Sequence, residues 1–439
     1  MPSILSLPPA PELYIPFYEG ELISVKASGK EMSGEKGEVL AQSIAELVRR
    51  NIRIVLAYGG GAQVSQLYRE TYGEDRPMRD GVAVCDGRVL QCAERVHDRL
   101  GLELRERLTR LLDCEVDVID PREVACEYMD FEERGFVGVP VGIENEMHAP
   151  VSLIGFNGRV GGQRVNVNAD DIARLLAPRM RENFLATETG GVLDRYDPAR
   201  AGEGTVVPVI FADEILPNGT HPRYAVEGGM KKKLACARAM ASHARVVITS
   251  GEHIPAEIFS VGGKGTLVVA RERISAGAPM EKEKDIVRFV IDGCERIGLF
   301  RPRSEAEKRR AIDRHLVLRD HTPLAGCALM EHDDGSVELG TLWGYNGMGV
   351  ILAQAAREKF HGMSASYRTL FALTSPENEQ NALEEDPAYK RFARYGFTFQ
   401  GRLSDAVAGK RAPAHLRFYD TSVRNPYLFT YARPEGVTP

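Results

Sequence analysis

The sequence predicts an α/β protein with two domains: a mostly parallel sheet covered by helices on both faces, followed by a separate α+β unit. The length of 439 residues exceeds what one hydrophobic core usually supports. Short β-branched runs alternate with helical patterns from Leu22 to about Ala270, an order that favours parallel strands. A polar stretch with Gly and Pro then breaks the pattern. We therefore expect an extension over residues 1–20, a first domain over 21–270, a linker over 271–284 and a second domain over 285–439.

The first domain is expected to begin with a strand, an amphipathic helix and a buried strand. In chain order, these elements and the strand–helix patterns after them cover residues 22–29, 37–51, 52–58, 61–70, 169–180, 183–194, 237–251 and 256–269. β-branched residues dominate the expected strands, and apolar residues recur at helical spacing in the helices.

The second domain is expected to consist mainly of antiparallel hairpins. Its helices are expected at 285–298, 304–313 and 387–397, and its strands at 315–320, 323–334, 367–374 and 425–432. Between them, Leu339–Phe360 begins as an apolar strand, breaks at Gly344 and continues as an amphipathic helix. Such a break exposes backbone amides at a helix start, which makes it a candidate anion site.

Composition bears on which partners and compartment to expect. The net charge of −6 and the pI near 6.0 give no electrostatic reason to expect nucleic acid or an anionic membrane as partner. Seven scattered cysteines without a CxxC pair favour reduced thiols over disulfides or a zinc site. No stretch approaches the roughly 20 apolar residues of a membrane helix, and no signal peptide is evident. We therefore expect a cytoplasmic protein without a metal site of its own.

A second glycine-rich break lies near the other end of the chain, at Gly59, Gly60 and Gly61. These residues follow the buried strand and open a helix, so their N–H groups point outward at the positive end of the helix dipole. The missing side chains let a phosphate come close. A tight turn without a ligand explains the same residues, so this signal by itself is weak.

Four residues elsewhere strengthen the prediction of a ligand site in the first domain. Lys26 ends the first strand, and open parallel sheets bind ligands at the carboxyl ends of their strands. Asn166 and Asp170 lie at the start of a later helix, and Lys233 lies one turn into another. Taken singly, each is more often a cap or a solvated charge. Together they predict a site for a phosphorylated ligand.

Together and in this order, these motifs resemble the amino-acid kinase family, and most closely its N-acetylglutamate kinases, over the whole first domain. The resemblance implies the amino-acid-kinase fold and the use of ATP with Mg²⁺. It implies that Lys26 and Lys233 stabilise the transferring phosphoryl group and that Asp170 orients them. The glycines at 59–61 and Asn166 would hold substrate and γ-phosphate. Phosphoryl transfer needs such positioning and positive charge rather than a covalent nucleophile.

One position departs from this family. Its members carry a Gly-Leu-Arg motif whose arginine holds the substrate α-carboxylate, whereas the matching stretch Asp80–Gly87 has Ala83 in the place of that arginine. A carboxylate finds no bidentate partner there. The phosphoryl acceptor is therefore open, and so is the choice between a live kinase, a kinase with another acceptor and a non-catalytic sensor.

The second domain resembles the GNAT acetyltransferases, and more specifically the acetyltransferase domain of N-acetylglutamate synthases. The order of the two domains is the strongest part of this resemblance, because a kinase-like domain followed by a GNAT domain is the layout of these synthases. It implies that acetyl-CoA binds with its pyrophosphate on the loop amides at the helix start. Gly344 stands where the family has Gln or Arg, and the loop is shorter than in the synthases. The residues expected to hold acetyl-CoA are Leu342, Trp343, Asn346, Gly347, Met348, Gly349 and Val350.

Acetyl transfer to an amine needs a base for the ammonium proton and a proton donor for the leaving thiolate. Glu338, on the strand that enters the loop, is the candidate base, acting directly or through water. Tyr389, near the start of the following helix, is the candidate acid. The alternatives are a solvated glutamate on a strand and a tyrosine on a helix surface.

Synthases of this family hold the carboxylates of glutamate with arginines before the first strand and on the last strand of the GNAT domain. Arg424 matches the latter, and Arg301 or Arg303 matches the former. A family lysine is missing, because residues 330–332 contain none. Glutamate is thus the expected acceptor, with another amino acid as the alternative.

The leading interpretation is synthesis of N-acetyl-L-glutamate from acetyl-CoA and L-glutamate, in arginine biosynthesis, with a kinase-like domain that is regulatory or active. The alternatives are a bifunctional synthase and kinase, a specialised amino-acid acetyltransferase, and a degenerate GNAT domain kept for packing. The resemblance further implies an arginine effector and a homo-oligomer.

Overall fold

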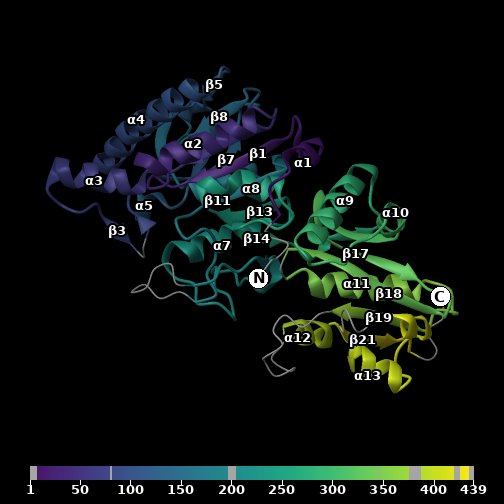
Figure 1. Cartoon of the computed structure of the whole chain (residues 1–439). Helices are drawn as coiled ribbons and strands as arrows, with labels where there is room; N and C mark the ends of the chain where they lie inside the picture. The colour runs from purple at the N-terminus through teal and green to yellow at the C-terminus, as the bar shows by residue number, and fades with distance from the viewer. Residues whose placement is uncertain are drawn as a thin grey trace. The chain divides into compact units, whose positions relative to one another are not determined.

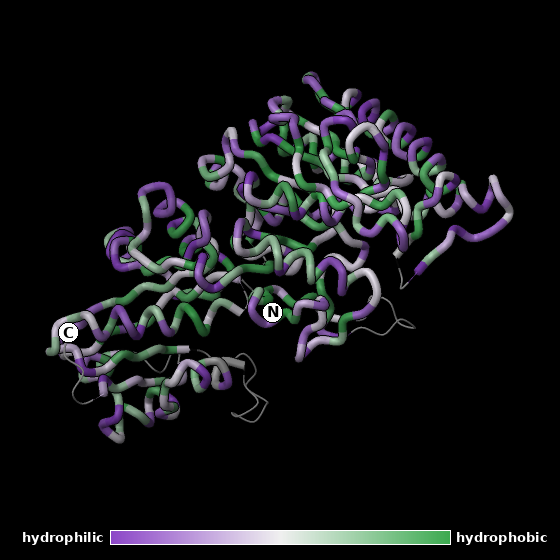
Figure 2. Tube along the Cα trace, turned by 180° about the vertical axis from the view of Figure 1, so that it is seen from behind, coloured by the Kyte–Doolittle hydropathy of each residue, from purple (hydrophilic) through white to green (hydrophobic). Residues whose placement is uncertain are grey.

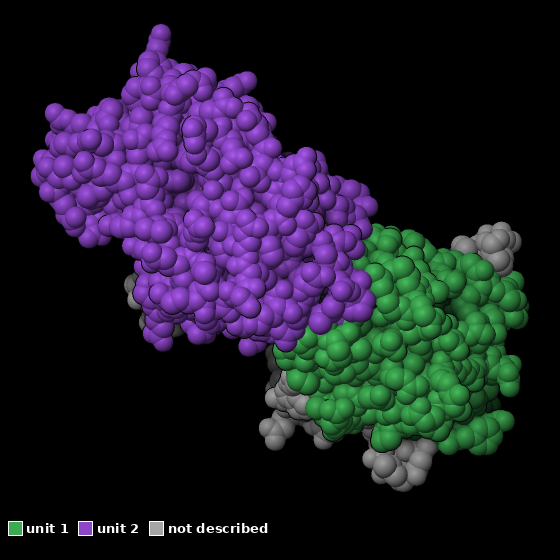
Figure 3. Space-filling view, turned by 90° about the horizontal axis from the view of Figure 1, so that it is seen from above, with its two compact units in different colours: residues 1–13, 260–262, 274–439 green, residues 14–259, 263–273 purple. Residues whose placement is uncertain are grey.

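The computed structural model describes residues 7–79, 82–195, 204–345, 347–374, 387–419 and 426–434. The chain forms two compact units (Figure 3). The first, called the N-terminal unit, comprises residues 14–259 and 263–273. The second, called the C-terminal unit, comprises residues 1–13, 260–262 and 274–439.

An eight-stranded sheet forms the centre of the N-terminal unit, in the order β12-β14-β13-β11-β1-β2-β8-β5 (Figure 1). Its strands are β1 (Leu22–Ala27), β2 (Arg53–Tyr58), β5 (Val116–Val118), β8 (Val151–Ile154), β11 (Glu182–Ala186), β12 (Val209–Phe211), β13 (Arg245–Thr249) and β14 (Thr266–Val269). All neighbours are parallel except β13 and β14. The predicted mostly parallel sheet is confirmed, and the carboxyl ends of β1 and β2 lie side by side, with Ala27 opposite Tyr58.

Helices accompany this sheet in two groups. Helix α4 contacts α2 and α3, and α2 contacts α8, whereas α6 and α7 pack together and contact β1, β2 and β13. The helices are α1 (Pro11–Tyr18), α2 (Gly34–Val48), α3 (Gly61–Tyr72), α4 (Gly87–Leu111), α5 (Phe131–Arg134), α6 (Ala169–Leu176), α7 (Gly228–Met240) and α8 (Ile254–Phe259). Leu185 and Ile248 of the sheet are buried with Ala237 of α7 in one core cluster, so α7 is fixed by apolar burial.

Four short strands of the N-terminal unit close into a small barrel. They are β6 (Val124–Tyr128), β7 (Val137–Ile143), β9 (Asn157–Val160) and β10 (Gln163–Val167). Closure brings backbones together, since a Cβ at Gly158 would lie 2.5 Å from Cys126 Sγ. A small hairpin, β3 (Met78–Arg79) with β4 (Val82–Ala83), follows α3. The sequence does not predict these strands, because they are short and interrupted by Gly and Pro.

The C-terminal unit contains a seven-stranded sheet in the order β15-β16-β17-β18-β19-β21-β20. Its strands are β15 (Ser275–Gly277), β16 (His315–Asp320), β17 (Thr322–Glu331), β18 (Ser336–Gly344), β19 (Thr369–Thr374), β20 (Thr398–Arg402) and β21 (Tyr427–Ala432). Only the β18–β19 pair among these described strands is parallel. The sheet therefore agrees with the predicted antiparallel unit, apart from one parallel pair in its middle.

The helices of the C-terminal unit are α9 (Glu281–Arg296), α10 (Glu305–Asp313), α11 (Gly349–His361), α12 (Pro387–Arg394) and α13 (Leu403–Ala408). The stretch 271–284, which lacks an apolar period, carries regular structure. β15 pairs with β16, and α9 begins within it at Glu281. The reason is non-local, because β15 is fixed by a strand distant in sequence.

Hydropathy follows this architecture. Figure 2 shows hydrophobic chain concentrated in the strands of both units and hydrophilic chain along the outer helices. In the C-terminal unit, Phe371 and Leu428 of the sheet pack against Leu403 of α13 and Leu416. Within the described residues, no helix combines the length and the apolar character that crossing a membrane requires.

Candidate functional sites

The first candidate site is a cavity of about 470 Å³ in the N-terminal unit. It lies at the carboxyl ends of β1 and β2, where Lys26 and the run Gly59–Gly61 line it. Asn166, from β10, lines it as well. The structure thus gathers these predicted ligand-binding residues around one cavity, at the sheet edge where open parallel sheets bind ligands.

Lys26 and Asp170 form a nearly buried ion pair at this cavity. Lys26 Nζ lies 2.6 Å from Asp170 Oδ1, and the side chains are 7% and 17% exposed. Lys233, in α7, is half-buried close to both. Burial lowers the pKa of Lys233, the Lys26 ammonium lowers it further, and Asp170 opposes both. The ammonium groups of Lys26 and Lys233 repel each other, so an anion that binds next to both would be stabilised.

Two glutamates that were not predicted belong to the same charge cluster. Glu31 follows β1 and Glu188 follows β11, and both act electrostatically on Lys233. Burial raises the pKa of Glu31, and the neighbouring Lys36 lowers it. Lys36 Nζ in turn lies 2.5 Å from Glu188 Oε1. These carboxylates reduce the repulsion between the ammonium groups while no ligand is bound.

The glycine run brings backbone close to the cavity at the start of α3. A Cβ at Gly60 would lie 2.5 Å from the Phe156 ring, so a side chain there requires movement. Gly59 is less restricted, because the nearest atom to its Cβ position is Ala169 Cβ at 3.5 Å. The first amides of α3 have no intrahelical acceptor and can bind an anion.

A guanidinium also lines this cavity. Arg76 lies between α3 and β3, is half-buried, and comes within 3.7 Å of the Cβ position of Gly61. Burial lowers the pKa of Arg76, and no carboxylate pairs with it among the residues that the structure describes. Arg79 differs, because it forms an ion pair with Glu133. Ala83, where the family has its arginine, lies in β4.

The second candidate site lies in the C-terminal unit, where β18 and β19 diverge. The two strands pair from Ser336–Thr369 to Glu338–Phe371. Beyond that point β18 continues on β17 to Gly344, and β19 continues on β21. The facing edges of the two strands then no longer bond to each other. Their backbone groups are available to an extended ligand that lies between them.

Residues alternate along β18, and Glu338, Gly340 and Leu342 lie on its more exposed face. The pairing of β18 with β17 shifts register between Gly340 and Trp343. Thr341 lies in this bulge with φ of 47°, which is unusual for a β-branched residue. Bulges leave backbone groups unpaired and are frequent next to active sites.

The loop after β18 leads to the first turn of α11. Gly344 and Gly347 have φ of 133° and 107°, conformations that favour glycine, so the chain bends sharply before α11. A Cβ at Gly349 would lie 1.9 Å from the Tyr395 hydroxyl, so the helix begins tight against that ring. The amides of the first turn have no intrahelical acceptor, which makes this helix start able to bind a phosphate.

Two residues predicted to hold acetyl-CoA turn away from the open face. Trp343 is buried, and its Nε1 donates to His315 Nε2 at 2.9 Å. Met348 is fully buried as well. These two side chains support the strand and helix from behind, so only their backbone can contact a ligand. Val350 is exposed at the helix start, and Asn346 lies outside the described residues.

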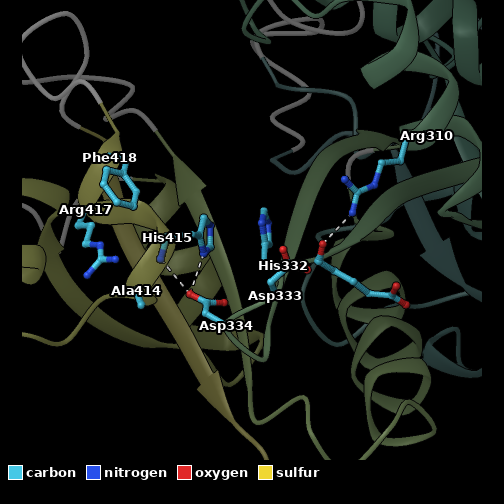
Figure 4. A pocket seen from close by; sticks show the side chains of 9 residues that line it. Arg310, His332, Asp333, Asp334, Ala414, His415, Arg417 and Phe418 are labelled. Atoms are coloured by element: carbon cyan, nitrogen blue, oxygen red, sulfur yellow. Dashed lines mark hydrogen bonds and ion pairs between the residues drawn. The ribbon is translucent and has the colours of Figure 1, made fainter.

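Glu338 lies at the end of the β18–β19 pairing and next to a pair of histidines. Its Oε2 is 3.8 Å from His332 Nε2. The His332 ring stacks on His415 with centroids 3.8 Å apart, and His415 Nδ1 lies 2.9 Å from Asp334 Oδ2 (Figure 4). Both rings line a cavity of about 440 Å³. The candidate base therefore has polar neighbours rather than an apolar surrounding.

Asp334 is held ionised beside these histidines. Burial raises its pKa, but hydrogen bonds from the Ser336 hydroxyl and from His415 lower the pKa well below its ordinary value. Ser336 Oγ donates to Asp334 Oδ1 at 2.6 Å. Arg310 and Arg417 lie on opposite sides of the cavity (Figure 4). The cavity offers carboxylate, imidazole and guanidinium groups to a small zwitterion.

The remaining predicted residues are placed differently. The side chain of Tyr389, in α12, and the whole of Arg424 lie outside the described residues. Arg301 Nη2 lies 3.0 Å from Glu307 Oε1 in α10, and Arg303 Nη1 lies 3.3 Å from a glutamate of α9. Both arginines thus neutralise nearby acids, and their role in substrate binding stays a prediction.

Comparison with known proteins bears first on the N-terminal unit. The model of the amino acid kinase family matches residues 21–250, just over half of the chain. The chain belongs to the amino acid kinase family. Among relatives in this family, the acetylglutamate kinase of Bartonella tribocorum is 27% identical over 294 residues, spanning 58% of this chain and 92% of that protein. The acetylglutamate kinase of Actinobacillus pleuropneumoniae serotype 5b is 28% identical over 239 residues, spanning 51% of this chain and 80% of that protein.

Solved structures extend the likeness beyond the amino acid kinase domain. N-acetylglutamate synthase from Neisseria gonorrhoeae, complexed with coenzyme A and N-acetyl-glutamate, matches with a TM-score of 0.53 and 18% identity over 95% of this chain and 96% of that one. The same enzyme complexed with coenzyme A and L-arginine matches with a TM-score of 0.58 over the same shares. The likeness shows the fold, which confirms an amino acid kinase domain followed along the chain by an α+β domain.

Several residues of this amino acid kinase domain were missed from the sequence. Glu31 and Glu188 lie just after strands at the carboxyl edge of the sheet, so their position relative to strand ends was a usable signal. Arg76 carried no such signal, because it lies in the connection between α3 and β3, outside the regular elements. The stacking of His332 on His415 was equally hidden, since the two residues are far apart in sequence.

Proposed function

We propose that the C-terminal unit transfers the acetyl group of acetyl-CoA to the α-amino group of L-glutamate, giving N-acetyl-L-glutamate and CoA. The observation that carries the proposal is the position of Glu338, where β18 and β19 stop pairing, on the strand that leads to the amides of α11. A carboxylate at one end of the opening and an anion site at the other suit the two ends of an acyl carrier. The fold shared with a synthase complexed with coenzyme A and N-acetyl-glutamate supports this proposal.

In the proposed mechanism, the first turn of α11 binds the pyrophosphate of the carrier, and the unpaired edge of β18 binds its amide groups. Glu338 takes one proton from the substrate ammonium, directly or through water. The freed amine attacks the thioester carbonyl, and backbone N–H groups near the bulge at Thr341 stabilise the developing oxyanion. The C–N bond forms, the C–S bond breaks, Tyr389 gives a proton to the leaving thiolate, and the second proton of the nitrogen returns through water to the Tyr389 oxygen.

The carboxylates of the acceptor are assigned to arginines near this opening. Arg310 and Arg417 line the cavity that contains the histidine neighbour of Glu338. Arg424 joins them on the strength of the family resemblance. Arg301 or Arg303 takes part only by exchanging its present acid partner for the substrate. The acetyltransferase function belongs to the domain over residues 285–439.

Release of CoA by the purified protein tests this proposal. We expect saturable release with acetyl-CoA and L-glutamate, and much slower release with the other common amino acids. Crystals soaked with CoA should show the pyrophosphate at the first turn of α11. Protein that releases no CoA with any amino acid contradicts the proposal.

A second function, phosphorylation of a carboxylate of an N-acetylated amino acid, is favoured by the charge cluster of the N-terminal unit. Lys26, Asp170 and Lys233 combine the positive charge and the positioning that phosphoryl transfer requires. ATP with Mg²⁺ is the implied co-substrate, and the domain over residues 21–270 would perform the reaction. ATP consumption that depends on N-acetyl-L-glutamate and disappears in Lys233→Ala supports this function, with Lys231→Ala as the control on the same helix. Unchanged consumption in Lys233→Ala contradicts it.

We further propose that L-arginine acts on the N-terminal unit and that the chain forms a homo-oligomer in the cytoplasm. The shared fold with a synthase complexed with coenzyme A and L-arginine supports the first point, and the family resemblance is the reason for proposing the other two. A shift of the melting temperature by L-arginine without turnover tests the first point, and light scattering of the purified chain tests the second.

A further inference from the structure

We propose that Arg76 is the carboxylate anchor of the N-terminal cavity, in place of the guanidinium that position 83 lacks. The inference rests on the proposed binding of an N-acetylated dicarboxylic amino acid in this cavity. Such a ligand has two carboxylates. One of them would lie near the lysines, and Arg76 would bind the other. A guanidinium suits this task because it binds both oxygens of a carboxylate at once.

Arg76 is a half-buried cation without a counter-ion in the described part of the chain. The one titratable group that acts electrostatically on Arg76 among the described residues is the Cys85 thiol. Burial raises the pKa of Cys85 to about 12, so this thiol is neutral at pH 7. A guanidinium removed from water without an acid partner is unfavourable, and a ligand carboxylate would relieve that cost.

The hairpin lies next to Arg76 along the chain. Met78 pairs with Ala83, and the Val84 N–H donates to the Pro77 carbonyl at 3.0 Å, which extends the contact between the two segments toward Arg76. Arg76 lies two residues before Met78, just outside β3, and both residues line the cavity. Diagonal neighbours across two paired segments lie about 7–8 Å apart, within reach of a long side chain. The guanidinium of Arg76 therefore reaches the cavity from the segment that faces position 83.

The remaining lining of the cavity fits an acylated dicarboxylate. Lys26 provides a second cationic group on the same cavity as Arg76. Apolar side chains of Val64, Met129 and Phe156 also line it and suit a short acyl group and an aliphatic chain. One carboxylate of the ligand then meets the lysines, where phosphoryl transfer would occur, and the other meets Arg76.

The test measures binding to the full chain by calorimetry with two probes, N-acetyl-L-glutamate and its α-amide. Wild-type protein should bind the acid about 10- to 100-fold more tightly than the α-amide, the range of a charge-assisted contact. In Arg76→Gln, affinity for the acid should fall by that factor, and affinity for the α-amide should stay the same. Loss of the discrimination, rather than loss of binding alone, identifies a carboxylate contact.

Two further variants separate this role from general effects. Arg79→Gln removes a nearby cation that is already paired with Glu133, so both affinities should stay at the wild-type level. In Arg76→Gln combined with Ala83→Arg, the preference for the acid should return, because a guanidinium enters from the opposite strand. Melting temperatures of all variants establish that they are folded. CoA release by wild-type protein is recorded separately, so a failure of acetyl transfer is distinguished from a failure at Arg76.

Two results overturn the inference. One is an Arg76→Gln protein that binds the acid with wild-type affinity. The other is a wild-type protein that does not discriminate between the acid and the α-amide, or that binds neither.

Discussion

Both units break a strand at glycines and start a helix there, but they surround the break differently. In the N-terminal unit, α3 begins after Gly59 and Gly60, and lysines and carboxylates gather at the same cavity. In the C-terminal unit, α11 begins at Gly349, and the sequence from Gly344 to Ala356 contains no charged residue. The same backbone device is therefore combined with charge in one unit and with apolar support in the other.

The two proposed functions would account for this difference, because they treat a bound phosphate differently. A pyrophosphate that is only held keeps its charge, so helix-start amides are sufficient for it. A phosphoryl group in transfer spreads negative charge in its transition state, so positioned cations accelerate the reaction. Under the proposed functions, Lys26 and Lys233 would supply such cations, whereas Glu338, the proposed base of the C-terminal unit, lies away from the helix start. Backbone amides at a helix start are thus enough to bind an anion, whereas phosphoryl transfer also needs cationic side chains.

The largest expected effect separates the two parts of the C-terminal site. Glu338→Gln removes the base but leaves the amides of α11, so CoA release should fall about 10²- to 10⁴-fold while CoA still binds. Steady-state release and calorimetry with CoA measure the two quantities. Glu358 is exposed on α11, and among the described residues its side chain bonds to that of Gln354, so Glu358→Gln should retain the wild-type rate. A Glu338→Gln enzyme with wild-type turnover would show that the base lies elsewhere.

The next largest effect concerns the ion pair between Lys26 and Asp170 in the N-terminal unit. Asp170→Asn leaves Lys26 nearly buried without its partner, so the free energy of unfolding should fall by about 3 kcal/mol. Urea denaturation of the full chain measures this. Glu46→Gln breaks a half-exposed pair with Arg50 and should cost less than about 0.5 kcal/mol. Equal stability of the two variants would mean that the Lys26 pair is no stronger than a surface pair.

The third prediction concerns the pH dependence of stability. In the C-terminal unit, Trp343 of β18 donates to the buried ring of His315. Burial lowers the pKa of His315 to about 4, although its bond to the Ala311 carbonyl raises it. In the unfolded chain the pKa returns to about 6.5, so the unfolded state binds the proton first. Burial of neutral His315 therefore contributes fully to the free energy of unfolding above pH 6.5, and this contribution is lost as the pH falls toward 4.

Denaturant titrations of wild type and His315→Gln at pH 7 and pH 5 measure this effect. Wild type should lose roughly 2 kcal/mol more than the variant between these pH values. His253→Gln, at a half-buried position in the other unit, is the comparison: burial lowers the pKa of His253 too, so this variant should remove a smaller part of the pH dependence than His315→Gln. If His315→Gln keeps the wild-type pH dependence, His315 is not the group that titrates.

The smallest effects test whether the two glycine breaks are independent. Gly60→Ala would push into Phe156, and Gly349→Ala into Tyr395, so each should cost about 1–3 kcal/mol. Gly59→Ala meets only an ordinary contact and should cost less. Melting temperatures with N-acetyl-L-glutamate or CoA then measure ligand binding. Gly60→Ala should lose only the first response and Gly349→Ala only the second; a crossed loss would break the comparison.

The sequence predicts the main sheets because their strands are long enough to show a pattern. β1 and β2 are apolar runs bounded by polar turns, and both were expected within a few residues of their observed ends. The small barrel was not, because its strands are stabilised by closing on one another rather than by local preference. Residues 275–277 join β16 for the same reason.

The candidate sites were predictable where a residue lies at the end of a regular element. Lys26 and Asp170 follow this rule, and they meet at 2.6 Å. Arg76 and the stack of His332 on His415 do not, because hairpin geometry and long-range packing bring them into place. Charge on a loop gives no signal until the loop's path is known.

The seven-stranded sheet consists of two parts, β15–β18 and β19–β21, that are joined only by the short pairing of β18 with β19. Three residue pairs, from Ser336–Thr369 to Glu338–Phe371, connect the two parts. A bound thioester carrier would form hydrogen bonds to both strands beyond Phe371 and so make the whole domain more rigid. Deuterium uptake by the backbone amides of β18 and β19 should therefore slow when the carrier binds, including at positions that do not contact the reactive end of the carrier.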